Sequence, residues 1–186
     1  LIARHPGRRL CHTQEQWIRD GMRINQMKKH RKSGGAIFPL CLPLCVISPS
    51  SVMIHRSLFD DVGLFDEKLP ACEDYDLWLR ICAHEEVLYV DTPLLLKYGG
   101  HGDQLSRSFW GMDRFRLQAL QKILRDPGLQ GDYRQLVVAT IVRKARILRQ
   151  GAEKRGKRLR AARFMAIEEH YGAPGESLAT FDEESK

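Results

Sequence analysis

Two adjacent carboxylates, Glu73 and Asp74, are the residues of this sequence best placed for acid–base chemistry. They begin a segment, residues 73–83, whose apolar side chains recur at helical spacing. The first turn of such a helix carries the positive end of the helix dipole, which favours ionised carboxylates. Helical spacing also puts Asp74 on the face that carries Leu77 and Trp78. We therefore expect an ionised proton acceptor at the edge of a packed helix, where it can face a cleft.

The same stretch also has a purely structural interpretation. Glu73 and Asp74 can simply complement the helix dipole. Asp76 can form an ion pair with Arg80, which follows four residues later. The residue pattern alone does not separate this interpretation from the catalytic one.

His101 is a further candidate, because the glycines of the segment Gly-Gly-His-Gly-Asp-Gln, residues 99–104, leave its imidazole unshielded. The glycines also let the backbone approach a ligand closely, so the histidine can belong to a binding site, or it can form a hydrogen bond to the backbone of a turn. A zinc site that combines it with Cys41, Cys45 and Cys72 is another alternative. No Cys-x-x-Cys pair supports that zinc site.

Two weaker possibilities involve side chains outside these motifs. The hydroxyls of Ser50 and Ser51 and the imidazole of His55 lack the strand–turn–helix context of a hydrolase nucleophile. The three tryptophans, Trp17, Trp78 and Trp110, can stack on a ligand, although a tryptophan more often belongs to the core.

The elements that must position these residues alternate between strand and helix. Strands are predicted at residues 9–13, 50–54, 87–90 and 94–98, the last two separated by Pro93. Helices are predicted at residues 56–62, with Gly63 as the C-terminal cap, and at residues 73–83. This alternation predicts a layered α/β domain over residues 1–105.

Residues 106–171 are expected to form a helical, basic extension, and residues 172–186 a flexible polar tail. A first helix is predicted at residues 107–124. A second begins near residue 132 and continues into a strongly basic stretch at residues 154–163. Its predicted apolar side consists of Leu136, Ala139, Val142, Ala145 and Ile147.

Composition restricts the class of protein but not its partner. The 186 residues are too apolar for a disordered chain, and 30 Lys and Arg against 23 Asp and Glu give a net charge of +7. The most apolar stretch, residues 36–47, is too short to span a bilayer and is interrupted by Pro39 and Pro43. The five cysteines are odd in number and lie mostly in apolar runs, so a reducing, cytoplasmic setting is expected.

Four motifs in a fixed order make the function more specific. They are SPSSVMIHR at residues 48–56, VGLFDEKL at 62–69, CEDYDLWLR at 72–80 and KYGGHGDQLS at 97–106. Together they resemble the C-terminal half of a bacterial family 2 glycosyltransferase, and the resemblance covers roughly the first 125 residues.

The resemblance implies a partial GT-A domain, the α/β fold of nucleotide-diphospho-sugar transferases, followed by C-terminal helices. It implies inverting transfer from a nucleotide-sugar donor to a saccharide or lipid-linked acceptor, with Asp74 as the catalytic base and Glu73 as its neighbour. It also implies a divalent cation, Mn²⁺ or Mg²⁺, with His101 at the metal or diphosphate site. No Asp-x-Asp motif precedes Ser48, so we expect a truncated chain that lacks the donor-binding half.

The basic C-terminal stretch leaves an alternative function open. Its lysines and arginines can neutralise nucleic-acid phosphates in a non-catalytic binding module. The same residues can lie on an anionic membrane surface, as a peripheral contact, or form a solvated helix face. No aromatic stacking motif accompanies the charge, which disfavours nucleic acid.

Overall fold

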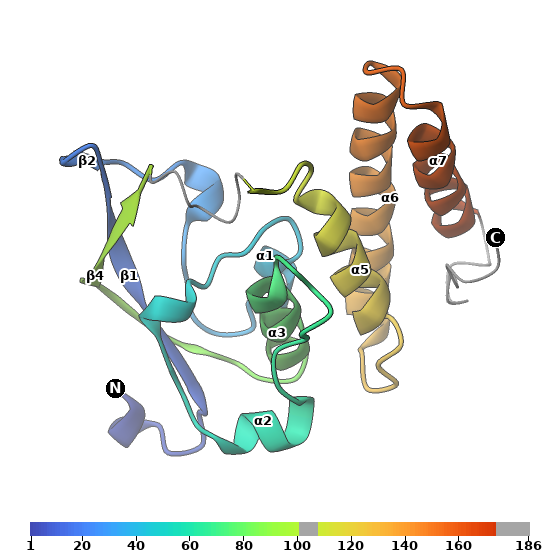
Figure 1. Ribbon diagram of the computed structural model, residues 1–186. Helices are drawn as coiled ribbons and strands as arrows, with labels where there is room; N and C mark the ends of the chain where they lie inside the picture. The colour runs from blue at the N-terminus through green and yellow to red at the C-terminus, as the bar shows by residue number, and fades with distance from the viewer. Residues whose placement is uncertain (101–107, 174–186) are drawn as a thin grey trace. The chain divides into compact units, whose positions relative to one another are not determined.

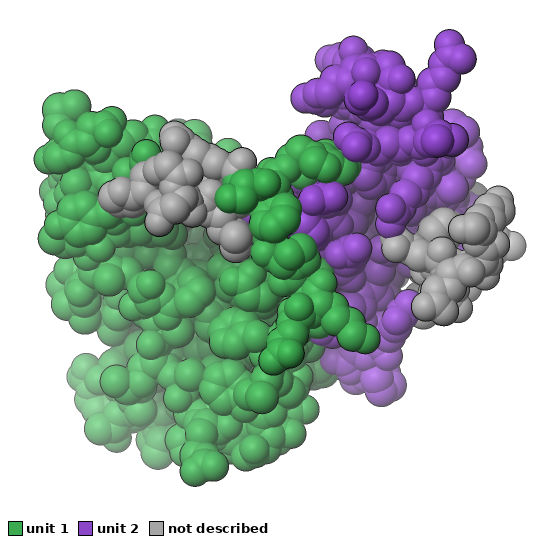
Figure 2. Space-filling view, in the orientation of Figure 1, with its two compact units in different colours: residues 1–110 green, residues 111–186 purple. Residues whose placement is uncertain are grey.

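The computed structural model describes residues 1–100 and 108–173, and the chain divides into two compact units, residues 1–110 and 111–186 (Figure 2). The first unit contains the sheet and the predicted catalytic carboxylates. The second consists of helices. Together they confirm the predicted α/β class followed by C-terminal helices.

A sheet organised around one long strand is the framework of the first unit (Figure 1). Its four strands are β1 (Leu10–Arg19), β2 (Met22–Ile24), β3 (Val52–Ile54) and β4 (Leu88–Gly99). β4 pairs in parallel with β1 along nearly its whole length. On the other side of β1, β3 pairs antiparallel with its start and β2 with its end. Every strand of this sheet therefore depends on β1.

Two strand predictions need correction. The stretches 87–90 and 94–98 form the single strand β4, because the register shifts opposite Thr13 to Glu15 and so accommodates Pro93. Among the described residues β4 pairs with β1 alone, so the missing N–H of Pro93 is tolerated at the sheet edge. The predicted buried strand 50–54 is shorter, and Met53 within it is exposed.

Short helices contribute a large part of the core of the first unit, most of it from the third of them. They are α1 (Phe38–Cys41), α2 (Ser57–Val62) and α3 (Glu73–Cys82), together with the 3₁₀ turns Ile2–Arg4, Lys28–His30 and Pro49–Ser51. α3 confirms the helix predicted at residues 73–83. It is buried on most sides, and its Tyr75 hydroxyl donates to the Leu42 carbonyl at 2.7 Å, which joins α3 to the end of α1.

The predicted pair between Asp76 and Arg80 is confirmed, and its carboxylate is buried. Arg80 donates to Asp76 Oδ2 from Nε at 3.0 Å and from Nη2 at 2.9 Å. The same guanidinium also donates to the carbonyls of Val62, Gly63 and Leu64. The pair therefore holds the segment after α2 against α3.

We expect Asp76→Asn to lower the free energy of unfolding by about 3 kcal/mol, because it leaves the charge of Arg80 uncompensated in a largely buried place. A urea titration measures this loss. Glu67→Gln removes an exposed carboxylate and should cost less than about 0.5 kcal/mol. Equal stabilities of the two variants would contradict the role given to the pair.

His12 on β1 is completely buried and neutral. Its Nε2 lies 2.8 Å from the Ser33 carbonyl, and its ring lies 5.1 Å from that of Tyr89. Burial lowers the pKa of His12 from 6.5 to about 4. The unfolded chain therefore binds a proton near pH 6.5 that the folded chain does not bind, and stability falls as the pH drops from 6.5 towards 4.

We expect the wild-type chain to lose about 2 kcal/mol more unfolding free energy than His12→Gln between pH 7 and pH 5. Glutamine keeps a donor for the Ser33 carbonyl but cannot be protonated. Urea titrations at several pH values measure the difference. His5→Gln, at an exposed position, should keep the wild-type slope, and an unchanged slope in His12→Gln would refute the assignment.

The second unit contains α5 (Asp113–Ile123), α6 (Gly131–Glu153) and α7 (Arg158–Gly172). α6 and α7 lie side by side and are joined by a short turn (Figure 1). The prediction that the second helix continues through the basic stretch is therefore wrong. The chain turns at Gly156, which has a φ of +63°.

The buried face of α6 also differs from the predicted one. Leu136, Ala139 and Ile147 are exposed, and the buried residues within this stretch are Val137, Thr140, Ile141, Lys144 and Ala145. Lys144 is buried because its Nζ donates to Asp113 Oδ1 on α5 at 2.8 Å. Burial alone would raise the pKa of Asp113, but the hydrogen bonds from Lys144 and Arg116 outweigh it and lower the pKa.

Candidate active site

Asp74 is the second residue of α3, and its half-buried carboxylate is held on both oxygens. Oδ1 accepts the backbone N–H of Tyr75 at 2.7 Å. Oδ2 accepts the Cys45 thiol at 3.4 Å. The carboxylate lies at the start of the ten-residue helix α3, where the helix dipole is positive. Asp74 is thus a positioned anion, as a general base requires.

The residue before the two carboxylates, Cys72, has an uncommon backbone conformation. Its φ of 65° and ψ of 22° lie in the left-handed region, where a residue with a Cβ is strained. Its carbonyl nevertheless accepts the N–H of Asp76 at 3.0 Å and so begins the helix. Such strained residues persist only where the surrounding structure holds them, and they cluster at functional sites.

The other two acidic residues at the start of α3, Glu73 and Asp76, have opposite environments. Glu73 is half-buried, and its carboxylate makes no hydrogen bond or ion pair to residues 1–100 or 108–173. Asp76 is buried and bonded to Arg80. Asp74 and Asp76 have Asp-x-Asp spacing, but the engagement of Asp76 with Arg80 argues against a shared metal site.

A buried ion pair, Glu15 with Lys32, lies in the same unit. Glu15 Oε2 and Lys32 Nζ are 3.3 Å apart, and each side chain is 2% exposed. Burial lowers the pKa of Lys32, although the charge of Glu15 opposes this effect. Lys32 is therefore buried, although it follows Lys28, Lys29 and Arg31 in a basic stretch of the sequence.

The other oxygen of Glu15 accepts two hydrogen bonds, one from its own strand and one from a distant segment of the chain. Oε1 accepts Trp17 Nε1 at 2.8 Å and Ser48 Oγ at 3.1 Å. Lys97 Nζ donates to Ser48 Oγ at 2.9 Å and lies 5.4 Å from the ring centre of Trp17. Burial would raise the pKa of Glu15, but the Trp17 hydrogen bond and the lysine charges outweigh it, so the pKa is lowered.

The segment 45–48 connects this cluster to Asp74. At one end, the Cys45 thiol contacts Asp74 and also the Ile47 carbonyl, at 3.2 Å. At the other end, Ser48 bonds to Glu15 and Lys97. The candidate base therefore lies one short segment away from two lysines.

Sequence reasoning missed the cluster of Glu15, Lys32, Ser48 and Lys97 because its members lie far apart in the chain. Only the pair Glu15-x-Trp17 is local, since the period of two in a strand puts both side chains on one face. A carboxylate two residues from a tryptophan in a strand was the available signal.

The predicted metal residue, His101, lies outside the described residues. Within residues 1–100 and 108–173, no group of three or more His, Cys, Asp or Glu side chains can hold a metal ion. The zinc alternative with Cys41, Cys45 and Cys72 therefore finds no support. A hydrogen bond with the Cys82 thiol, together with burial, raises the pKa of the Cys41 thiol.

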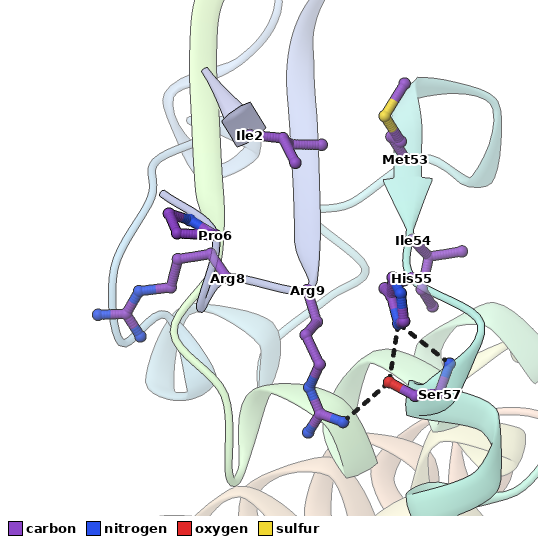
Figure 3. Close-up of a pocket in the computed structure, with 8 residues that line it drawn as sticks. All are labelled: Ile2, Pro6, Arg8, Arg9, Met53, Ile54, His55 and Ser57. Atoms are coloured by element: carbon purple, nitrogen blue, oxygen red, sulfur yellow. Dashed lines mark hydrogen bonds between the residues drawn. The ribbon is translucent and has the colours of Figure 1, made fainter. Parts of the chain in front are cut away.

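A separate pocket of about 390 Å³ lies where β1 begins and α2 starts (Figure 3). Arg9 donates to Ser57 Oγ at 3.2 Å, and His55 Nδ1 lies 2.8 Å from the same hydroxyl. The charges of both arginines that line the pocket are already compensated, Arg9 by Asp61 and Glu85 and Arg8 by Glu86. This pocket is therefore no anion site, and the contact between His55 and Ser57 is a local feature at the start of α2.

Comparisons with known proteins agree with this architecture. Residues 35–125 match the family described as glycosyltransferase like family 2. This matched segment includes Cys45, Ser48, Glu73 and Asp74. The match confirms the resemblance to family 2 glycosyltransferases over residues 35–125.

Several curated relatives that are named as glycosyltransferases come from Rickettsia. An uncharacterized glycosyltransferase of Rickettsia bellii is 38% identical over 68 residues, which cover 36% of this chain and 10% of the relative. One of Rickettsia typhi is 36% identical over 73 residues, which cover 39% of this chain and 22% of the relative. The match thus spans about a tenth to a fifth of these relatives. No solved structure matches significantly.

No helix in the described part of the chain is long and apolar enough to cross a membrane. This finding agrees with the short, proline-interrupted apolar stretch seen in the sequence.

We expect Lys32→Met to lower the free energy of unfolding by about 3 to 5 kcal/mol, because it leaves the carboxylate of Glu15 buried without its nearest cation. The double variant Lys32→Met with Glu15→Gln should recover part of this loss. Urea titrations of both single variants and the double variant measure the coupling.

Lys97→Met is the matched control for this cycle, because the Lys97 side chain is 47% exposed. It should cost less than about 1 kcal/mol. If Lys32→Met costs no more than Lys97→Met, the buried pair does not have the structural role assigned to it.

Proposed function

We propose that the first unit supplies the acceptor side of an inverting glycosyltransferase, which transfers a sugar from a nucleotide-sugar donor to an acceptor hydroxyl. The observation that carries this proposal is the carboxylate of Asp74. It is half-buried, held on both oxygens at the start of α3, and lies within the segment that matches the glycosyltransferase family.

The proposed reaction is a single in-line displacement. The acceptor oxygen forms a bond to the anomeric carbon while the bond from that carbon to the phosphate oxygen breaks. The electron pair of the broken bond leaves with the nucleoside diphosphate, and Asp74 takes the proton of the acceptor hydroxyl. Attack from the face opposite the leaving group inverts the anomeric centre.

The surroundings of Asp74 suit this role in two ways. The N–H of Tyr75 and the thiol of Cys45 orient the carboxylate, and each oxygen keeps a lone pair for a further hydrogen bond. Glu73, beside it, has no partner among the described residues, so a second carboxylate is available to bind an acceptor hydroxyl.

Positive charge near the site suits an anionic donor. Lys97 is held by Ser48 yet half-exposed, so its ammonium group can interact with the diphosphate of a donor. A divalent cation near His101 belongs to the proposal through the family resemblance, because Mn²⁺ or Mg²⁺ stabilises charge on a leaving diphosphate. The described residues supply no ligand group for it, and we derive no step through it.

In the full-length gene product we expect Asp74→Asn to reduce kcat by about 10²- to 10⁴-fold, with little change in donor binding. Asparagine keeps the size of the side chain and one acceptor oxygen but cannot take a proton. The measurement is transfer from a labelled nucleotide-sugar, with thermal unfolding to verify that the variant is folded.

Asp60→Asn is the matched control, because Asp60 is an exposed carboxylate in the first turn of α2. It should retain wild-type turnover. If Glu73→Gln abolishes transfer while Asp74→Asn remains active, the base is the other carboxylate. Near wild-type rates in both variants would rule out this mechanism.

A further inference from the structure

The turn between α6 and α7 has an unusual composition. Residues 154–159, which we call the hairpin tip, have the sequence Lys-Arg-Gly-Lys-Arg-Leu, with four cations among six residues. All six are exposed. Leu159 is 91% exposed, more than any other large apolar side chain in the described part of the chain. An aliphatic side chain thus projects into solvent among positive charges.

The positive charges of the hairpin tip form no ion pair with the described residues. The side chains of Lys154, Lys157 and Arg158 form no hydrogen bond or ion pair with residues 1–100 or 108–173. Arg155 donates to the Gly151 carbonyl at 2.6 Å but to no carboxylate. The adjacent acid, Glu153, accepts a hydrogen bond from Arg149 at 2.7 Å.

The hairpin tip is held in place by the helices that it joins. Glu168 on α7 accepts hydrogen bonds from Arg146 at 2.7 Å and from Arg149 at 2.9 Å, both on α6. The N–H of Lys157 donates to the Ala152 carbonyl at 3.0 Å, which closes the end of α6. The cations and Leu159 are therefore presented on a defined turn.

We propose that the hairpin tip docks on the surface of an anionic lipid bilayer. The lysines and arginines would lie at the level of the phosphate headgroups, and Leu159 would enter the boundary with the acyl chains. Charge complementarity selects an anionic surface, and the exposed leucine selects a lipid one. A nucleic acid would match the charges but would give Leu159 no apolar partner, and the tip has no aromatic side chain to stack on a base. This proposal does not depend on the glycosyltransferase mechanism.

The test is co-sedimentation of the full chain with vesicles of phosphatidylcholine, with and without 30% phosphatidylserine. We expect retention on the anionic vesicles alone and its loss at high salt, because salt screens the headgroup charge. Each cation near such a surface strengthens binding about five-fold, so Lys154→Gln with Lys157→Gln and Arg158→Gln should weaken it about 100-fold.

Leu159→Ser tests the apolar contact separately. It keeps every charge and should weaken vesicle binding about ten-fold, with the salt dependence unchanged. A purely electrostatic contact would leave the affinity of this variant at the wild-type value, which would overturn the proposed insertion.

The matched control removes three exposed cations from the first unit, Arg4→Gln with Arg23→Gln and Arg56→Gln, and so makes the same change in net charge. It should leave vesicle binding within about two-fold of the wild type. The proposal is overturned if the control and the tip variant lose vesicle binding equally, or if the wild-type chain does not co-sediment with anionic vesicles. Tighter, tip-dependent binding to single-stranded RNA or duplex DNA would also overturn it.

Discussion

The buried negative charge of Glu15 is the constraint on which the first unit depends. Removing a carboxylate from water costs several kcal/mol unless cations and hydrogen-bond donors replace the water. Lys32, Trp17 and Ser48 make direct contacts with it, and Lys97 adds a second positive charge. These residues come from β1, β4 and two connecting segments. Satisfying one charge therefore brings four parts of the chain together around the strand that organises the sheet.

The hydrogen bonds around Glu15 also connect to the start of α3, whose two aspartates lie in different environments. Segment 45–48 bonds to Glu15 at one end and to Asp74 at the other, so the start of α3 is tied to the centre of the sheet. Asp76, two residues further on, faces inward and is neutralised by Arg80. Asp74 is half-buried and instead accepts hydrogen bonds from the Tyr75 N–H and the Cys45 thiol. One helix thus provides both a structural carboxylate and a carboxylate suited to catalysis.

The local sequence pattern was sufficient to predict features that involve residues close together in the chain. Helical spacing predicted α3 with Glu73 and Asp74 in its first turn, because residues three and four apart meet on one helix face. The pair of Asp76 and Arg80 followed from the same spacing. The ordered motifs identified the glycosyltransferase family, which the match over residues 35–125 confirms. The catalytic roles of Asp74 and Glu73 and the metal role of His101 stay predictions.

The strand pairing and the burial of charged residues depend on partners far apart in the chain, and only the tertiary structure shows them. The merging of two predicted strands into β4 required the register with β1, where a shift accommodates Pro93. The burial of Lys32 required Glu15, and the rotated face of α6 required Asp113 as a partner for Lys144. From neighbouring residues alone, a lysine is predicted to lie on the surface. Its burial requires a carboxylate from another element, which compensates the loss of hydration of the ammonium group. By itself, the sequence determined the helix that begins with Glu73 and Asp74, the pair of Asp76 with Arg80, and the motifs shared with family 2 glycosyltransferases. Long-range charge compensation decided which polar residues are buried.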